Sequence, residues 1–512
     1  MGEVISGERR ISSEALNERA ARAATGLASL GLGRGDLIAI YLRNDIPFFE
    51  ASIAASLLGA YPTPVNWHYV EAEARYLFEN SGAKVIVIHA DLIEAVRSAL
   101  PPGVPVLVVA TPPEIAQAYG IAEEPVPPGM IGWSSWLETF EPWSGPPTEA
   151  PGTIIYTSGT TGHPKGVRRN PPNAEQSAAQ ARMLFMAFGL ADWVERPGEI
   201  VTVVTGPMYH SAPNAYGGIA VRLGARVILE PRFDPEELLA LIDREKVTHI
   251  HMVPIMFTRL LRLPEEVKAK YDLSSLRFVV HAAAPCPAPI KRAMIEWWGP
   301  VINEYYGSTE TGAVVFCTSE QWLSHPGTVG KAMPGADVRV IDAAGNSLPA
   351  GEVGEVVAKT GDLADFTYHG DDAKRAASEK AGLIAPGDIG YLDADGFLYL
   401  CDRAKDMIIS GGANIYPAEI EAELMKMPGV ADCGVFGIPD EEFGEAVCAV
   451  VQPMPGHELS QTEVRTFLRE RMASYKVPKR VDFHAELPRE DSGKIFKRKL
   501  REPFWEGLDR RI

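Results

Sequence analysis

Cysteine is scarce in this chain of 512 residues, and no two cysteines stand at a metal-binding spacing. The five that occur are an odd number and include no C-x-x-C pair. A secreted disulfide framework needs a dense, even set of cysteines, and a zinc site needs short pairs of ligands. The sequence therefore predicts neither a disulfide scaffold nor a zinc site, and it suits a reducing compartment.

Positive charge is also in deficit. The chain has 49 Lys and Arg against 67 Asp and Glu, which gives a formal net charge of −18. A nucleic-acid partner requires a basic face that neutralises phosphates. We therefore expect no nucleic-acid partner, whereas a small polyanionic ligand needs only a local positive patch.

Long apolar runs are missing as well. No stretch approaches the eighteen uninterrupted apolar residues that a membrane-spanning helix requires. The first residues lack the basic and then apolar layout of a signal peptide, and Arg510-Arg511-Ile512 is not a peroxisomal tripeptide. We therefore expect a cytoplasmic protein without a membrane span.

Short apolar runs and helical patterns alternate along much of the chain. This alternation is typical of an α/β domain with a largely parallel sheet. The helical patterns include residues 12–32 and 48–58. The predicted strands of this part are 37–42, 84–88, 200–204, 225–229, 248–253 and 277–280.

The pattern changes after about residue 327. Short β-rich runs with turn signals follow, and the mostly charged segment 402–406 then separates two apolar runs. We expect a large multi-layer α/β domain with a β-rich subdomain over residues 1–402. Residues 403–512 have the size of a small α+β domain.

The segment Tyr156–Gly166 reads Tyr-Thr-Ser-Gly-Thr-Thr-Gly-His-Pro-Lys-Gly. Glycines let backbone N–H groups approach an anion, hydroxyls add donors, and Lys165 adds a mobile positive charge. The segment is not a P-loop, because Pro164 and Gly166 occupy positions where that pattern needs Gly and Ser/Thr. Its composition favours a polyphosphate-binding turn over the alternative, a polar surface hairpin.

The segment Asn303–Gly312 combines two tyrosines, a hydroxyl cluster and Glu310. The aromatic rings could stack on a base, and the hydroxyls could hold phosphate. Glu310 could supply one oxygen to Mg²⁺, which usually takes one or two carboxylates besides phosphate oxygens. The alternative for the paired tyrosines is packing in a core.

Two later segments present single charged residues from turns. Asp388, between glycines in Gly387–Tyr391, could accept both hydroxyls of a ribose, although alone it would be a turn residue. Asp491-Ser492-Gly493-Lys494 presents a lysine from a tight turn. A basic cluster follows, which is either functional or a solvated face: Lys497, Arg498, Lys499 and Arg501.

Together these segments closely resemble the adenylate-forming superfamily: acyl-CoA synthetases, adenylation domains of peptide synthetases and firefly-type luciferases. The motifs occur in the family's order over nearly the whole chain, which looks most like an AMP-forming carboxylate–CoA ligase. The resemblance implies a two-step reaction. A carboxylate attacks the α-phosphorus of Mg·ATP to give an acyl-adenylate and pyrophosphate, and a thiol such as coenzyme A then displaces AMP. Such catalysis depends mostly on positioning and charge stabilisation.

The resemblance also implies residue roles. The segment from Thr157 to Lys165 would hold the β- and γ-phosphates, Asp388 the ribose and Glu310 the Mg²⁺. Lys494 would bridge the carboxylate and the α-phosphate. The implied catalytic residues are Lys494, Glu310, Thr309 and His210. The implied ATP/AMP-binding residues are Thr157, Ser158, Gly159, Thr160, Thr161, Gly162, Lys165, Ala283, Ala284, Glu304, Tyr305, Tyr306, Gly307, Ser308, Thr309, Asp388, Arg403 and Lys494.

The small domain is implied to be mobile. Lys405 stands at the family's hinge position, about which that domain rotates between the half-reactions. The turn Ser410, Gly411 and Gly412 would then approach coenzyme A.

The acyl pocket is implied to include His210, Asn214, Ala282 and Gly312. The surrounding segments 208–216, 280–284 and 308–313 are mainly small and apolar, and they hold no basic residue that could pair a second carboxylate. We therefore expect a hydrophobic acid of the fatty, aryl or alicyclic/steroid type. The chain also departs from its relatives, because His281-Ala-Ala-Ala-Pro285 has alanines where they often carry glycines.

Two other functions compete with a CoA ligase. The same first step could serve transfer to a carrier protein or an amine, although no carrier domain is fused here. A non-catalytic nucleotide-binding regulator could share the fold, but the presence of Lys494, Glu310 and Lys165 together weighs against it.

Overall fold

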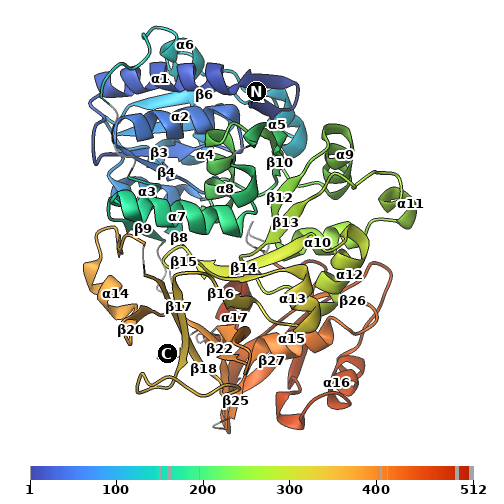
Figure 1. Cartoon of the computed structure of the whole chain (residues 1–512). Coiled ribbons are helices and arrows are strands. Elements are labelled where there is room, and N and C mark those ends of the chain that lie inside the picture. The colour runs from blue at the N-terminus through green and yellow to red at the C-terminus, as the bar shows by residue number, and fades with distance from the viewer. Residues whose placement is uncertain are drawn as a thin grey trace.

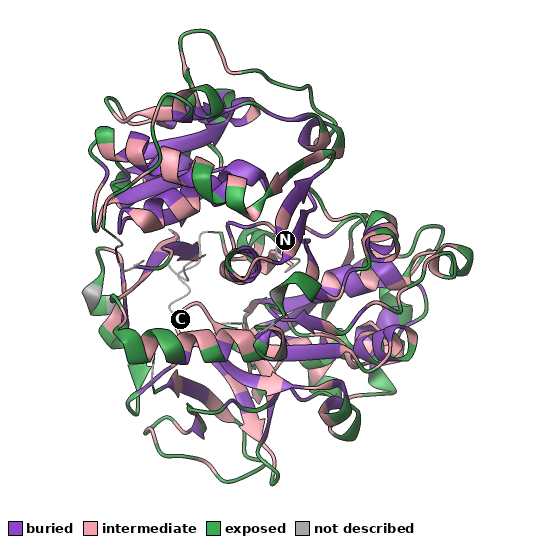
Figure 2. Cartoon of the chain, turned by 45° about the horizontal axis from the view of Figure 1, so that its top comes forward, coloured by how far each residue is buried: buried purple, intermediate pink, exposed green. Residues whose placement is uncertain are grey.

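The computed structural model describes residues 2–146, 148, 151–157, 164–194, 196–361, 363–403, 406–411, 413–489 and 495–506. Two sheets with covering helices form the larger part of the molecule, and the C-terminal residues form a smaller body below it (Figure 1). Buried residues concentrate in the strands, and exposed residues follow the outer faces of the helices (Figure 2).

The N-terminal sheet is parallel throughout, in the order β4-β3-β5-β6-β7. Its central strands consist of β-branched and other apolar residues that are buried on both faces, as expected of a covered parallel sheet. The strands are β3 (Leu37–Tyr41), β4 (Tyr61–Pro64), β5 (Val85–His89), β6 (Val106–Val109) and β7 (Ile131–Gly132).

The central sheet has fifteen strands within the described residues. Its first part is parallel from β1 through β14, apart from the edge strand β2, and the antiparallel hairpin β14–β15 then leads into the β-rich part. Its strands are β1 (Glu3–Ser6), β2 (Arg9–Ser12), β10 (Val201–Val204), β11 (Arg226–Leu229), β12 (His249–Met252), β13 (Phe278–His281), β14 (Ile302–Ser308), β15 (Gly312–Cys317), β16 (Gly330–Ala332), β17 (Ala336–Ile341), β18 (Gly354–Thr360), β20 (Glu379–Lys380), β21 (Leu383–Ile384), β22 (Asp388–Leu392) and β23 (Phe397–Arg403).

Helices cover both sheets, and several begin at recognisable caps. Ser12 accepts a hydrogen bond from the Ala15 N–H at the start of α1, and Asn173 and Gln176 form a reciprocal capping box at the start of α7. The helices of this part are α1 (Ser13–Ser29), α2 (Ile46–Leu57), α3 (Glu71–Ser81), α4 (Ile93–Val96), α5 (Pro113–Tyr119), α6 (Trp133–Leu137), α7 (Ala174–Ala187), α8 (Ser211–Arg222), α9 (Pro235–Glu245), α10 (Pro254–Leu261), α11 (Glu265–Lys268), α12 (Ala288–Trp298), α13 (Ser319–Ser324) and α14 (Asp372–Ala377).

A small antiparallel sheet joins distant parts of the chain. It consists of β8 (Ile155–Thr157), β9 (Lys165–Arg169) and β19 (Phe366–Tyr368), in the order β19-β9-β8. The two strands that flank the predicted phosphate-binding turn are therefore neighbours, and Thr157 is paired in register with Lys165.

The C-terminal residues fold around their own sheet and core. The strands are β24 (Ile408–Ser410), β25 (Ala413–Ile415), β26 (Val430–Asp440), β27 (Gly444–Pro453) and β28 (Arg480–Phe483), and the helices are α15 (Pro417–Leu424), α16 (Gln461–Arg469) and α17 (Lys497–Trp505). Ile408, Val435, Val447 and Val464 are among the buried residues of this core.

The observed architecture confirms the predicted fold class, a large α/β domain followed by a small α+β domain. Each predicted strand of the N-terminal part appears within a residue or two of its expected place. Of the helices that the structure describes, none has the length and apolar character needed to cross a membrane.

Candidate active site

One end of the candidate site is built by three strands of the central sheet, β14, β22 and β23, around a buried carboxylate. The Tyr306 hydroxyl donates to Asp388 Oδ2 at 2.7 Å, and Arg403 Nε lies 3.1 Å from Asp388 Oδ1. Asp388 opens β22, directly opposite Arg403 at the end of β23. Burial, and then the adjoining negative charge of Asp388, raise the pKa of the Tyr306 phenol well above its usual value. The structure thus brings together three predicted nucleotide-binding residues from distant parts of the chain.

The turn of the β14–β15 hairpin forms the second part of the site. Arg169 donates to the backbone oxygens of Thr309 and Glu310 at 2.9 and 2.7 Å. The Tyr368 hydroxyl donates to Glu310 Oε1 at 3.0 Å, and Thr309 Oγ1 lies 3.3 Å from Ser211 Oγ. The hairpin tip is therefore fixed from β9, β19 and the start of α8.

The ligands at this tip fit a magnesium ion that is held mainly by phosphate. Glu310 keeps one carboxylate oxygen outside any hydrogen bond within the described residues, and it lines the cleft. No group of three or more potential metal ligands occurs in the part of the chain that the structure describes. A metal here would take one protein oxygen and complete its shell with phosphate oxygens and water, which is the usual arrangement for Mg²⁺.

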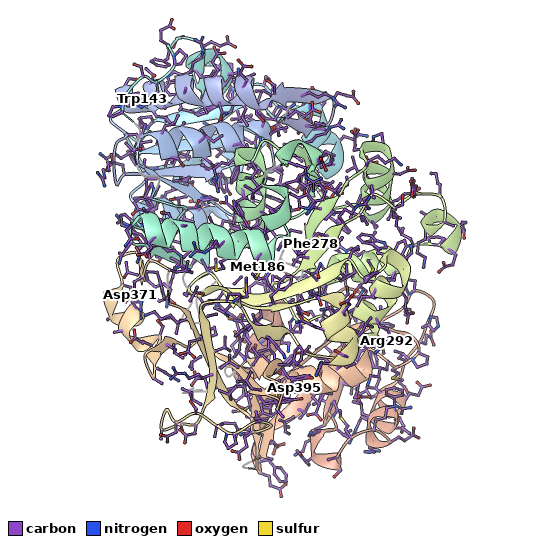
Figure 3. The ribbon with its side chains drawn as sticks, in the orientation of Figure 1. Trp143, Met186, Phe278, Arg292, Asp371 and Asp395 are labelled. Carbon is purple, nitrogen blue, oxygen red and sulfur yellow. The ribbon has the colours of Figure 1, made fainter. Side chains whose placement is uncertain are left out.

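A third part faces the expected polyphosphate. Thr157 and Lys165 lie side by side at the ends of β8 and β9. Partial burial lowers the pKa of Lys165, and the negative charge of Asp371 opposes this effect; Asp371 is labelled in Figure 3. The predicted residues between these strands, Ser158, Gly159, Thr160, Thr161 and Gly162, lie outside the described residues.

The two adjacent tyrosines of β14 point to opposite sides, as strand alternation requires. Tyr306 reaches Asp388, whereas the Tyr305 hydroxyl lies 3.3 Å from His251 Nε2 and its ring packs 6.0 Å from the Phe188 ring. Both rings were expected to contact the base of the nucleotide. The structure divides them, because Tyr306 faces Asp388 whereas Tyr305 faces His251 and Phe188.

Glu304 lies on the same strand but is committed to an internal ion pair. Lys291 Nζ is 2.5 Å from Glu304 Oε2, and the lysine side chain is fully buried. Burial raises the pKa of Glu304, and the lysine opposes that change. This pair anchors α12 beneath the strand.

The wall that follows β13 contains a strained alanine. Ala283 has φ +74°, in the left-handed region that favours glycine, whereas Ala282 beside it is buried. Ala282, Ala283 and Ala284 all line the cleft. The alanine substitution noted in the sequence therefore falls where the backbone conformation makes glycine the natural residue.

The predicted acyl-pocket residues gather at the start of α8 and the hairpin. His210 occupies the N-cap position of α8, and Asn214 Nδ2 donates to the Met208 carbonyl at 3.0 Å. Gly312 has φ +71°, and a Cβ there would lie 3.1 Å from Met183 of α7. Gly307 is equally constrained, because a Cβ there would lie 1.9 Å from the Gly312 carbonyl oxygen.

All of these parts face one continuous cleft of about 2640 Å³. It extends from Asp388 and Arg403, past Glu310 and His210, into an arm between α2, α7 and α8. A cleft of this size can hold a nucleotide together with an apolar molecule.

Comparison with known families identifies this arrangement. The model described as AMP-binding enzyme matches residues 3–365, and the model described as AMP-binding enzyme C-terminal domain matches residues 419–494. The chain belongs to the AMP-binding enzyme family. It is an adenylate-forming acid ligase and an enzyme of the AMP-forming acid–CoA ligase family.

Relatives within the AMP-binding family match along nearly their whole length. The chain is 33% identical to the fatty acid–[acyl-carrier-protein] ligase ScoC of Streptomyces coeruleorubidus, covering 99% of this chain and 94% of the relative. It is 32% identical to the long-chain-fatty-acid–CoA ligase FadD13 of Mycobacterium tuberculosis, covering 97% and 93%. Among solved structures, ATP-bound MatB from Rhodopseudomonas palustris is 27% identical with a TM-score of 0.82, covering 99% and 96% of the two chains.

The C-terminal part of this AMP-binding enzyme contributes residues on both sides of the predicted turn at Lys494. Arg489 and Ile495 line the cleft, as do the four basic residues Lys497, Arg498, Lys499 and Arg501. Lys497 pairs with Glu421 at 2.7 Å, and Arg498 with Glu502 at 2.6 Å. Lys494 and the hinge candidate Lys405 lie outside the described residues.

The predicted coenzyme A turn is placed elsewhere. Ser410 and Gly411 do not belong to the residues that line the cleft within the described part of the chain, and Gly412 lies outside the description. Gly411 donates its N–H to the Phe443 carbonyl at 2.8 Å, and the neighbouring side chains of Ile409 and Phe443 are exposed.

Sequence analysis missed three residues that the structure places in or against the cleft: Arg169, Tyr368 and Arg222. Arg169 and Tyr368 act on the hairpin tip through hydrogen bonds across the small sheet, which no local motif announces. Arg222 ends α8 and lines the arm between the helices. The segments in which no basic residue was expected end at residue 216 on this helix, so Arg222 lay outside them.

Proposed function

We propose that this enzyme is an ATP-dependent carboxylate–CoA ligase for a hydrophobic acid. The carboxylate oxygen attacks the α-phosphorus of ATP, and the P–O bond to pyrophosphate breaks. The sulfur of coenzyme A then attacks the acyl carbon of the adenylate, and the C–O bond to AMP breaks. The products are an acyl-CoA, AMP and pyrophosphate.

The observation that carries the proposal is the joint orientation of two tyrosine–carboxylate pairs toward one cleft. Tyr306 and Asp388 would bind the ribose, and Tyr368 positions Glu310 for a metal ion beside the phosphates. Lys165 and Thr157 would contact the leaving pyrophosphate. Thr309 would contact the α-phosphate between them. The fixed donors and charges would favour the transition state without reorganisation during the reaction.

The acid would occupy the branch that begins at His210 and Asn214. Its walls include Met183, Leu184 and Phe188, which are apolar side chains at one helical face of α7 and its end. ScoC and FadD13 are named for fatty acids, and their similarity along the whole chain supports a hydrophobic acid here too.

The domain boundary and the hinge belong to the same proposal. We place the boundary between Asp402 and Arg403 and the hinge at Lys405, with Lys494 acting in the first half-reaction. The turn that contains Ser410 and Gly411 would meet coenzyme A in the second half-reaction.

A panel of fatty, aryl, alicyclic, dicarboxylic and amino acids, assayed by pyrophosphate release with and without coenzyme A, tests this function. We expect release with apolar acids and faster turnover when coenzyme A is present. A preference for amino acids, or indifference to coenzyme A with every acid, would contradict it.

Transfer to a carrier protein is the second candidate, and the similarity to ScoC is the observation that favours it. A purified acyl carrier protein replaces coenzyme A in the same assay. Thioester formation with the carrier protein but not with coenzyme A would support this alternative.

A further inference from the structure

Three helices enclose the arm of the cleft that leads away from the hairpin tip. Each presents one face at helical spacing: Ser211, Ala215, Gly218 and Arg222 on α8, Phe49, Ser52, Ile53 and Ser56 on α2, and Ser177, Ala181 and Leu184 on α7. Residues at these intervals lie along a single side of a helix. The arm is therefore a groove that runs along the helices.

The length of helix α8 indicates the length of this groove. Ser211 stands at its start, where its hydroxyl is 3.3 Å from Thr309, beside the expected reacting centre. Arg222 is the last residue of the helix, eleven positions further on. At 1.5 Å per residue, this separation is about 16 Å along the axis.

Arg222 is a cation without a protein partner. Among the described residues, its guanidinium forms no ion pair and no hydrogen bond. No Asp or Glu of the described parts of α1, α2, α7 or α8 lines the cleft. Its side chain is exposed, yet the surrounding protein removes it from bulk water enough to lower its pKa. This combination is expected of a group at the open end of a cleft.

The guanidinium folds back over its own helix toward the groove. A Cβ on Gly218 would lie 3.5 Å from one terminal nitrogen of Arg222, so the glycine leaves room for the group on that face. An arginine at a helix C-terminus can also interact with the helix dipole, typically by 0.3–1 kcal/mol. That role alone would explain the position of Arg222 but not why its guanidinium lines the cleft.

Polar side chains from a fourth helix, α1, also line the cleft. Ser13 and Asn17 of α1 line it, and a Cβ on Gly2 would lie 2.6 Å from Ser13 Oγ and 2.3 Å from the Gly224 carbonyl oxygen. The start of α1 thus lies against the end of α8. Ser52 Oγ, from α2, has no hydrogen-bond partner within the described residues. These hydroxyl and amide groups line the same cleft as Arg222.

We propose that Arg222 binds a second carboxylate at the distal end of the acyl substrate, so that the preferred acid is a long apolar chain with a carboxylate at each end. The inference rests on the proposed function, because it assigns the first carboxylate to adenylation beside Thr309. The apolar side chains of the groove accommodate the chain, and a charge-assisted bidentate contact with the guanidinium fixes its far end.

The test compares α,ω-dicarboxylic acids of increasing chain length with monocarboxylic acids of the same length. Pyrophosphate release is measured for the wild-type protein, for Arg222→Gln, and for Arg182→Gln as the matched control. Arg182 is an exposed residue of α7 that does not line the cleft. Thermal unfolding of each variant establishes that the fold is unchanged.

For wild type we expect kcat/KM to favour the dicarboxylate at least ten-fold at the optimal length. Arg222→Gln should abolish this preference, because the KM for the dicarboxylate should rise at least ten-fold more than the KM for the monocarboxylate. Arg182→Gln should behave as wild type. These contrasts correspond to about 1.4 kcal/mol per ten-fold.

The outcomes separate the two proposals. If monocarboxylates are activated and Arg222→Gln does not alter the preference, the role of Arg222 is wrong and the ligase function stands. If the preference falls in Arg182→Gln as well, general surface charge explains it and the inference fails. If no acid of either series releases pyrophosphate, the proposed function itself fails.

Discussion

At the scale of single residues, Asp388 carries the largest share of the proposed nucleotide contact. Its two oxygens are held by Tyr306 and Arg403, and only 8% of the residue is exposed. Asp388→Asn keeps the shape but removes the charge, and charge-assisted hydrogen bonds are about twice as strong as neutral ones. We expect kcat/KM for ATP to fall about ten- to hundred-fold, mainly through KM.

A matched substitution lies at the other end of the same hairpin. Asp395 is in the turn between β22 and β23, its side chain is 72% exposed, and it is labelled in Figure 3. Asp395→Asn should leave the steady-state constants for ATP unchanged. An unaltered KM for ATP in Asp388→Asn would remove this carboxylate from the ribose site.

Ala283 makes a second residue-scale prediction, on stability. A left-handed conformation costs an alanine roughly 1–2 kcal/mol, whereas the extra backbone freedom of glycine costs about 0.5–1 kcal/mol. Ala283→Gly should therefore stabilise the protein slightly, by up to about 1 kcal/mol. Thermal unfolding should show a midpoint about 1 °C higher. The neighbouring control Ala282→Gly deletes a buried methyl and should lower the midpoint; the same sign for both variants would contradict the strain argument.

At the scale of elements, strands β12 and β13 carry three buried histidines: His249, His251 and His281. Burial lowers the pKa of His249 and of His251 from 6.5 to about 4, and it lowers that of His281 well below 6.5. Below pH 6.5 the unfolded chain therefore binds more protons than the folded chain. The free energy of unfolding should rise with pH between about 4 and 6.5. Above that range these histidines should no longer change it.

The size of this effect follows from the pKa difference. Each unit is worth 1.36 kcal/mol, so at pH 5 His251 alone should reduce the free energy of unfolding by roughly 2 kcal/mol. Denaturant unfolding at several pH values measures it. His251→Gln should make the acid-side slope shallower than in wild type, and an unchanged slope would show that His251 does not titrate on unfolding.

The elements also show what the sequence can and cannot predict. The strands were predictable because each is a short apolar run, and the motif of β14 indicated where nucleotide contacts would gather. Strand alternation also predicts that Tyr305 and Tyr306 face opposite sides of the sheet. The sequence does not show which residues they contact, because these lie on distant strands, β12 for Tyr305 and β22 for Tyr306. Arg169 was not predictable, because it binds backbone oxygens, and these carry no residue-specific signal. Arg222 was not predicted either, because no sequence motif marks it and only the packing of the helices brings it to the cleft.

At the scale of the whole molecule, two predicted functional turns of the C-terminal part cannot serve the cleft at once. Arg489 and Ile495, on either side of the segment that contains Lys494, line the cleft in the present arrangement. Ser410 and Gly411 do not. If coenzyme A meets the latter turn beside the acyl-adenylate, the small domain must change its orientation between the half-reactions.

Two substitutions should therefore affect opposite half-reactions. Lys494→Ala should reduce adenylation at least about a hundred-fold, as expected when one electrostatic contact to the transition state is lost. It should leave the reaction of coenzyme A with supplied acyl-adenylate intact. Gly411→Ala should retain adenylation, because this turn lies away from the cleft. Its Cβ would lie 2.8 Å from Phe443 and its φ is +56°, so the turn must distort. Thioester formation should then fall about ten- to hundred-fold.

Pyrophosphate exchange measures the first half-reaction, and single-turnover thioester formation from supplied adenylate measures the second. Opposite losses in the two variants require that the same domain presents different surfaces to one reacting centre. An equal loss of both half-reactions in each variant would instead mean that a single closed arrangement carries out the whole reaction, and the rotation about Lys405 would have no role.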